Sequence, residues 1–135
     1  MSTIAKHENP FEKFVRRLRF EGLALAILMV ALTHYSSAPL WILPATFLLF
    51  DISIVAYKFN NHVGALAYNF IHDATIPTLL IVLGLVLHTE WVSIVGFCWT
   101  FHIAVDRALG YGLKHDTSFH HTHLGKIGKN KNLNQ

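Results

Sequence analysis

Four long apolar stretches recur along the chain and constrain its fold more than any other feature. Each is close to the ~20 residues that a helix needs to cross a ~30 Å hydrocarbon core. Apolar residues make up 53% of the 135-residue chain and charged residues only 14%, so too little polar sequence remains to cover four helices in water. The sequence therefore predicts one all-α domain, a bundle of four transmembrane helices at approximately 20–36, 38–57, 64–88 and 90–113.

Basic residues predict how this bundle is oriented. All eleven Lys and Arg side chains fall before the first span, between the second and third, or around and after the end of the fourth. The two remaining turns, THYSSAP and HTEW, contain none. Because cytoplasmic loops are enriched in Lys and Arg, we expect both termini in the cytoplasm, with residues 1–19 at the membrane surface and 114–135 as a His-rich tail. The net charge of +3 then reflects topology, and no nucleic-acid partner is indicated.

Ionisable side chains inside the predicted spans gather at one depth. Asp51, His72, His102 and Asp106 come from three spans and lie about 9–17 Å below the cytoplasmic surface at 1.5 Å per residue. His102 and Asp106 are four residues apart, so they project from one face of a helix. Because charged groups are costly inside a bilayer, their convergence favours a functional site.

Histidine and carboxylate groups from facing helices are typical of metal sites in helical bundles. We predict a divalent metal ion (Zn, Fe or Mn) whose ligands are His72, His102, Asp106 and His123. The segment KHDTSFHHTHLG follows the flexible GYG turn and is long enough to fold back as a cap on the inner face. The residues predicted to act in catalysis are Asp51, Asp106 and His121. Those predicted to bind substrate are Glu21, Tyr68, Asn69, Arg107, Tyr111 and Lys114.

Several short motifs resemble those of a family of small bacterial integral membrane proteins known as domain of unknown function 4260. They are EGLAL, FDISIVAY, GALAYNFIH, HIAVDRALGYGLK and THLG, and the resemblance covers most of the chain. The family pattern has an acidic residue where this chain has His121. The resemblance implies a membrane site in the bacterial inner membrane. The matching positions are Glu21, Asp51, Tyr57, Gly64, Tyr68, Asn69, His72, His102, Asp106, Arg107, Tyr111, Lys114 and His123.

Three functions use these residues in different ways. In the first, a metal-dependent enzyme hydrolyses an ester, amide or phosphoester of a lipid-like substrate, with Asp51 or His121 as general base and Arg107 or Lys114 binding its anionic part. In the second, the cluster relays protons or ions in a transport component, and a homodimer completes the route. In the third, a polar network stabilises the bundle or binds a partner protein and holds no metal.

Overall fold

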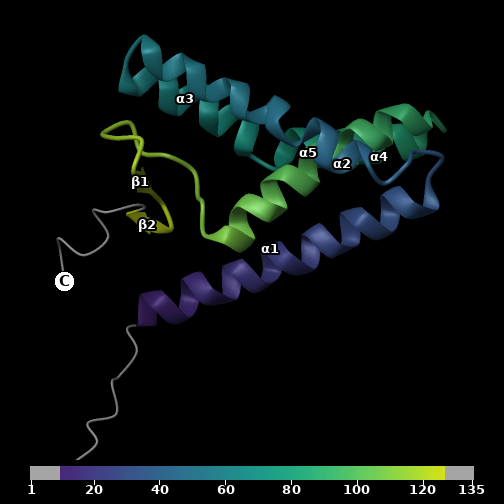
Figure 1. Cartoon of the computed structure of the whole chain (residues 1–135), viewed down its shortest axis with the longest axis horizontal. Helices are drawn as coiled ribbons and strands as arrows, with labels where there is room; N and C mark the ends of the chain where they lie inside the picture. The colour runs from purple at the N-terminus through teal and green to yellow at the C-terminus, as the bar shows by residue number, and fades with distance from the viewer. Residues whose placement is uncertain (1–9, 127–135) are drawn as a thin grey trace, which may run out of the picture.

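The computed structural model describes residues 10–126, which are helical apart from turns and one short hairpin. Two antiparallel two-residue strands, β1 (His121–Thr122) and β2 (Gly125–Lys126), form this hairpin. In Figure 1, α1 runs along the lower edge of the molecule, and the other helices lie above it. The helices are α1 (Pro10–Tyr35), α2 (Ile42–Thr46), the 3₁₀ helix η1 (Phe47–Lys58), α3 (Asn61–His72), α4 (Thr75–Val86) and α5 (Glu90–Leu109).

A glycine allows α1 and α5 to pack closely. A Cβ atom on Gly22 would lie 2.7 Å from the backbone nitrogen of Ala108 and 2.8 Å from the carbonyl oxygen of Ala104, so no larger residue fits without a shift. Arg19 Nε donates a hydrogen bond of 2.8 Å to the Ala108 carbonyl and ties the same two helices together. These contacts hold the C-terminal part of α5, the helix that carries three of the predicted site residues, His102, Asp106 and Arg107.

The predicted third span, 64–88, is divided into two helices. α3 ends at His72, Asp73 has extended backbone angles (φ −84°, ψ 132°), and α4 begins at Thr75. Asp73 Oδ1 accepts a 2.8 Å hydrogen bond from the Thr75 amide, and such capping favours a new helix start. Pro77 falls in the first turn of α4, where a missing N–H is tolerated. The predicted third span is therefore interrupted at Asp73 and Ala74.

The other predicted spans also have different bounds. The second, 38–57, is the short α2 followed by η1, a 3₁₀ helix of 12 residues, although such helices rarely exceed three or four. The fourth ends at Leu109, because Gly110 has a left-handed backbone (φ 94°) that terminates α5. The first span continues backwards to Pro10 as part of α1.

Two helical stretches of the described chain are long and apolar enough to cross a membrane. They are Asn61–Val86, which includes the break, and Glu90–Leu109. This is consistent with a membrane protein family. The arrangement of four spans, and the side on which the termini lie, remain predictions.

The chain after α5 folds back between the ends of α1 and α3, as Figure 1 shows for the yellow segment with β1 and β2. Lys114 forms an antiparallel backbone bridge with Thr122, and the His123 amide donates to the Leu113 carbonyl at 3.0 Å. The segment also contacts α3, because Asn69 bonds the Lys114 backbone and Asn61 bonds the Thr117 carbonyl. That it caps a cytoplasmic face of the bundle stays a prediction. Residues 127–135 of the predicted tail lie outside the described chain.

Candidate metal centre

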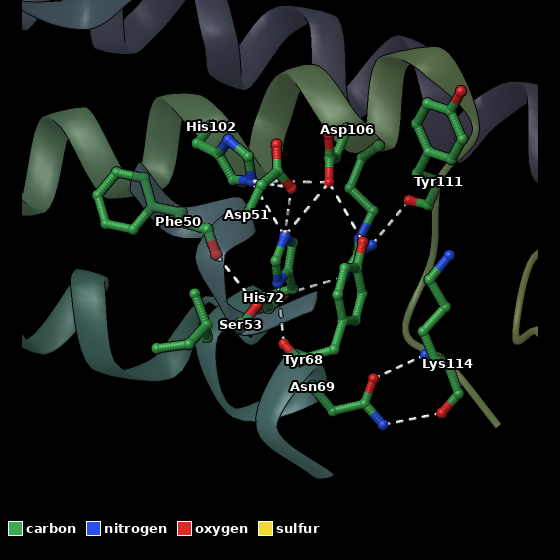
Figure 2. A network of polar contacts seen from close by, with 12 residues as sticks. Phe50, Asp51, Ser53, Tyr68, Asn69, His72, His102, Asp106, Tyr111 and Lys114 are labelled. Atoms are coloured by element: carbon green, nitrogen blue, oxygen red, sulfur yellow. Dashed lines mark hydrogen bonds and ion pairs between the residues drawn. The ribbon is translucent and has the colours of Figure 1, made fainter. Parts of the chain in front are cut away.

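Four predicted site residues place one potential ligand atom each within 4.8 Å of all the others: Asp51, His72, His102 and Asp106. The Nε2 atoms of the two histidines are 3.0 Å apart. His72 Nε2 lies 3.6 Å from both Asp51 Oδ1 and Asp106 Oδ2, and His102 Nε2 lies 3.7 and 3.8 Å from the same oxygens. Figure 2 shows the two carboxylates and the two imidazoles pointing toward one another.

Three separate elements bring these groups together. Asp51 lies on η1, His72 is the last residue of α3, and His102 and Asp106 lie one turn apart on α5. The i, i+4 spacing on α5 places both side chains on one helix face, as the sequence predicted. The site therefore joins the η1–α3 hairpin to α5, and its geometry depends on how these two parts of the fold meet.

Burial is nearly complete for three of the four residues. The side chains of His72 and His102 are fully buried, and that of Asp106 is 13% exposed. Asp51 is the most accessible, with 32% of its side chain exposed. Ionisable groups removed from solvent in this way need partners of opposite charge or a bound cation.

Tyr68 fixes the tautomer of His72. His72 Nδ1 lies 2.9 Å from the Tyr68 carbonyl, which only accepts hydrogen bonds, so Nδ1 carries the proton. In the neutral ring the lone pair is then on Nε2, which points at the cluster. The Tyr68 ring also stacks on the imidazole, with centroids 3.7 Å apart, and its hydroxyl donates to Asp106 Oδ2 at 3.3 Å. Such outer contacts orient histidine and carboxylate ligands in metal sites.

His102 has only one hydrogen-bond partner among the described residues, Nε2 of His72. Its Nδ1 is buried with no hydrogen-bond partner, while the rings of Phe47 and Phe50 lie 4.5 and 5.4 Å from its own. Without an ion, Nε2–H of His102 can donate to the lone pair of His72 Nε2. To hold an ion, both histidines would use an unprotonated Nε2, and the proton of His102 would then be on Nδ1.

The separations fit a small divalent ion. Metal–ligand distances of about 2.0–2.1 Å in a tetrahedral zinc site place neighbouring ligand atoms about 3.3 Å apart. Five of the six separations, 3.0 to 3.8 Å, bracket this value, and the sixth is no longer than 4.8 Å. Two imidazoles and two carboxylates suit Zn, Fe or Mn. The residues present therefore match the metal predicted from the sequence, with Asp51 in the group and His123 outside it.

Side chains from α5 hold the end of α3, where helical carbonyls would otherwise lack partners. Trp99 Nε1 donates to the Ile71 carbonyl at 2.6 Å, and Arg107 Nη2 donates to the His72 carbonyl at 3.1 Å. Arg107 Nη1 also donates to the Tyr111 carbonyl at 2.8 Å. The Trp99 contact was not predicted, since an indole within an apolar run is usually a packing residue.

The folded-back segment contacts the site through Lys114. Asn69 bonds both backbone groups of Lys114, accepting from its amide at 2.7 Å and donating to its carbonyl at 2.8 Å. Lys114 Nζ lies 5.0 Å from the centroid of the Tyr68 ring and 4.0 Å from that of Phe119. Burial lowers the pKa of the Lys114 ammonium to about 8, although Asp106 and Asp51 act in the opposite direction.

Three other predicted site residues lie elsewhere or are not described. Glu21 is exposed on α1. His123 Nδ1 accepts a 2.8 Å hydrogen bond from the Leu113 amide, which holds its ring against the turn after α5. Among the described residues, the group of possible ligands does not include His123. The side chain of His121 lies outside the described part of the chain, so its predicted role as a base stays a prediction.

Comparison with known proteins places the chain in a family but assigns no activity. The model of a family described as a domain of unknown function, DUF4260, matches residues 15–127. This match confirms the resemblance found in the sequence motifs. Neither the curated proteins nor the solved structures include a match to the chain.

Proposed function

We propose that this chain, which belongs to the DUF4260 family, is a membrane enzyme that uses one divalent metal ion to hydrolyse an ester, amide or phosphoester of an amphiphilic substrate. One observation carries the proposal: four ligand atoms from three elements lie within 4.8 Å of one another in a largely buried setting. The proposed topology has four spans and both termini in the cytoplasm. The two apolar stretches and the one-sided distribution of basic residues support it.

A bound cation explains the site better than a polar network alone. Two carboxylates converge within 4 Å of both imidazoles, and in a membrane this negative charge is costly unless it is neutralised. The fixed tautomer of His72 leaves a lone pair directed at the cluster.

The four residues divide into three buried ligands and one accessible carboxylate. His72, His102 and Asp106 would hold the ion, which matches the three protein ligands usual in catalytic zinc sites. When bound, the ion would lower the pKa of a water molecule and supply a nucleophile near neutral pH. Asp51, the most exposed of the four, would accept the proton from that water. Tyr68 holds Asp106 and His72 in position throughout.

The first experiment measures metal content by mass spectrometry on tag-free protein purified in detergent. We expect about one ion per chain in the wild type, and loss of that ion in His72→Ala and His102→Ala. His123→Ala and His34→Ala serve as controls that retain the ion, since neither residue belongs to the four-residue group. Circular dichroism and size-exclusion chromatography show whether each variant is folded.

Two results would contradict the proposal. Folded wild-type protein that stays metal-free after incubation with Zn, Fe and Mn would leave the structural network or the relay as the better explanation. Loss of metal in folded His123→Ala would mean that the tail supplies a ligand, as the sequence predicted.

A second experiment tests the role of Asp51 in hydrolysis. Asp51→Asn should keep the ion but hydrolyse a lipid ester that the wild type accepts as substrate at least about 100-fold more slowly. A general base typically accelerates such a reaction 10²–10⁴-fold. If Asp51→Asn loses the ion, Asp51 is a ligand and another group acts as the base.

A further inference from the structure

Most directions of approach to the four-residue site are closed by protein. The Tyr68 ring covers one face of His72, and Phe47 and Phe50 pack against His102. α5 itself supplies the wall that carries His102 and Asp106, and α1 packs along the same helix. Access from these sides would require the helices to separate.

The end of the site nearest the folded-back segment is closed as well. Arg107 bridges the carbonyls of His72 and Tyr111, and the Asn69 side chain forms two hydrogen bonds with the Lys114 backbone. Lys114 is 5% exposed, with its ammonium over the Tyr68 ring. A solute arriving along the bundle axis from this end would meet these contacts before it reached the ligands.

The remaining exposed part of the site is Asp51, and its surroundings on η1 are apolar. Residues three apart share one face of a 3₁₀ helix, so Leu48 and Ile54 border Asp51 along η1. Leu48 is 72% exposed and the adjacent Ile52 is 61% exposed. No residue of η1 is fully buried. In a bilayer, an exposed surface of this composition contacts lipid chains.

We infer that the site opens sideways into the bilayer at Asp51, between Leu48 and Ile54, and that its substrate is a membrane lipid which enters from the hydrocarbon region. The inference rests on the proposed function and names its substrate class. A lipid in the same leaflet would reach the site by sideways diffusion, with its chains against η1 and its reacting carbonyl or phosphoryl group near Asp51. Water-soluble esters of the same chemistry would be poor substrates.

The opening is tested without any metal by spin labelling and electron paramagnetic resonance in liposomes. A nitroxide is attached at Asp51→Cys in a Cys98→Ala background, and its collisions with oxygen and with a water-soluble nickel chelate are compared. Oxygen concentrates in the hydrocarbon region and the chelate stays in water. Ile52→Cys is the lipid-facing reference, and Tyr111→Cys, just beyond α5, is the reference for the aqueous side.

We expect the Asp51 label to resemble the Ile52 label, with oxygen collisions dominant. A label at Leu48→Cys, which keeps Asp51 in place, should give the same result if Asp51→Cys does not fold. Dominant collisions with the nickel chelate at these two positions, as at Tyr111, would mean that the site opens to water and would overturn the inference.

The substrate class is tested with the cobalt-loaded wild-type protein in liposomes. Palmitohydroxamate should change the visible absorption of the bound Co²⁺, whereas acetohydroxamate at the same total concentration should not. A change of the Co²⁺ absorption with acetohydroxamate and none with palmitohydroxamate would also overturn the inference. Protein that takes up no cobalt would count against the proposed function, and the spin-label result would still decide where the site opens.

Discussion

The two hydrogen bonds between the Asn69 side chain and the Lys114 backbone should determine how firmly the folded-back segment is held on the bundle. Asn69→Ala removes both contacts to the Lys114 backbone, at 2.7 and 2.8 Å. The loss of each contact leaves a partly buried backbone group of Lys114 without a partner, which costs about 1–3 kcal/mol. Because both groups belong to one residue and share one anchor, the two losses do not add in full, and together they should favour the released segment by about 2–4 kcal/mol, roughly a 30- to 1,000-fold change in the opening equilibrium.

Trypsin cleavage after Lys114 reports this opening. Lys114 is 5% exposed, so cleavage of the following bond requires the segment to leave the bundle. When opening and closing are fast relative to cleavage, the rate follows the population of the open form. We expect mass spectrometry to show cleavage at this bond 30- to 1,000-fold faster in Asn69→Ala than in the wild type.

The chain offers a matched control on the same helix. Asn61 Nδ2 donates a single long hydrogen bond, 3.4 Å, to the Thr117 carbonyl of the same segment, and this contact is exposed. Asn61→Ala should therefore change cleavage by less than about fivefold, since a solvated contact of this kind contributes little. Equal cleavage rates in wild type, Asn61→Ala and Asn69→Ala would refute the view that Asn69 anchors the segment.

Three further outcomes are expected. Tyr68→Phe should weaken zinc binding about 10- to 100-fold in a chelator competition, because the hydroxyl that orients Asp106 is lost. Tyr57→Phe is the control and should bind zinc as the wild type does, because the Tyr57 hydroxyl has no partner among the described residues. Burial lowers the pKa of Lys114 from 10.5 to about 8. Between pH 8 and pH 10.5 the folded state therefore binds fewer protons than the unfolded state, so the free energy of unfolding should rise by up to about 3 kcal/mol over this range. The rise should be absent in Lys114→Met, and urea titrations at several pH values would measure it. Gly22→Ala should destabilise the metal-free protein by about 1–3 kcal/mol through overcrowding against α5, measured by thermal unfolding in detergent, and an unchanged midpoint would argue against this close packing.

The sequence predicted the parts of the site that depend on local spacing. His102 and Asp106 share a face because they are four residues apart on one helix, and no tertiary information was needed for this. Asp51 and His72 were expected at a similar depth from their distance to the span ends. Depth alone could not show whether Asp51 or Asp106 would lie beside the two histidines. In the structure both carboxylates lie there.

The position of His123 depends on the path of a turn, which spacing does not determine. Gly110 and the bridge between Lys114 and Thr122 direct the chain so that the His123 ring bonds the Leu113 amide. The break in the third span was missed for a related reason. A proline within an apolar stretch, such as Pro77, can end or kink a helix, but the contact between Asp73 and Thr75 determines that the helix stops and restarts here.

The break at Asp73 also has an electrostatic consequence. Aligned peptide groups give a helix a partial negative charge of about half a unit at its C-terminal end. Since α3 ends at His72, this charge falls beside the four-residue site, whereas an uninterrupted helix to Val86 would carry it to the far end of the stretch. Trp99 and Arg107 bond the Ile71 and His72 carbonyls at this end, so their positive hydrogens offset part of the charge. The positive N-terminal end of α4 begins at Thr75, where the Asp73 carboxylate bonds the first amide and offsets part of that charge. The remaining negative charge of the α3 end favours a bound cation, and a chain in which α3 and α4 were fused would have neither helix end beside the site.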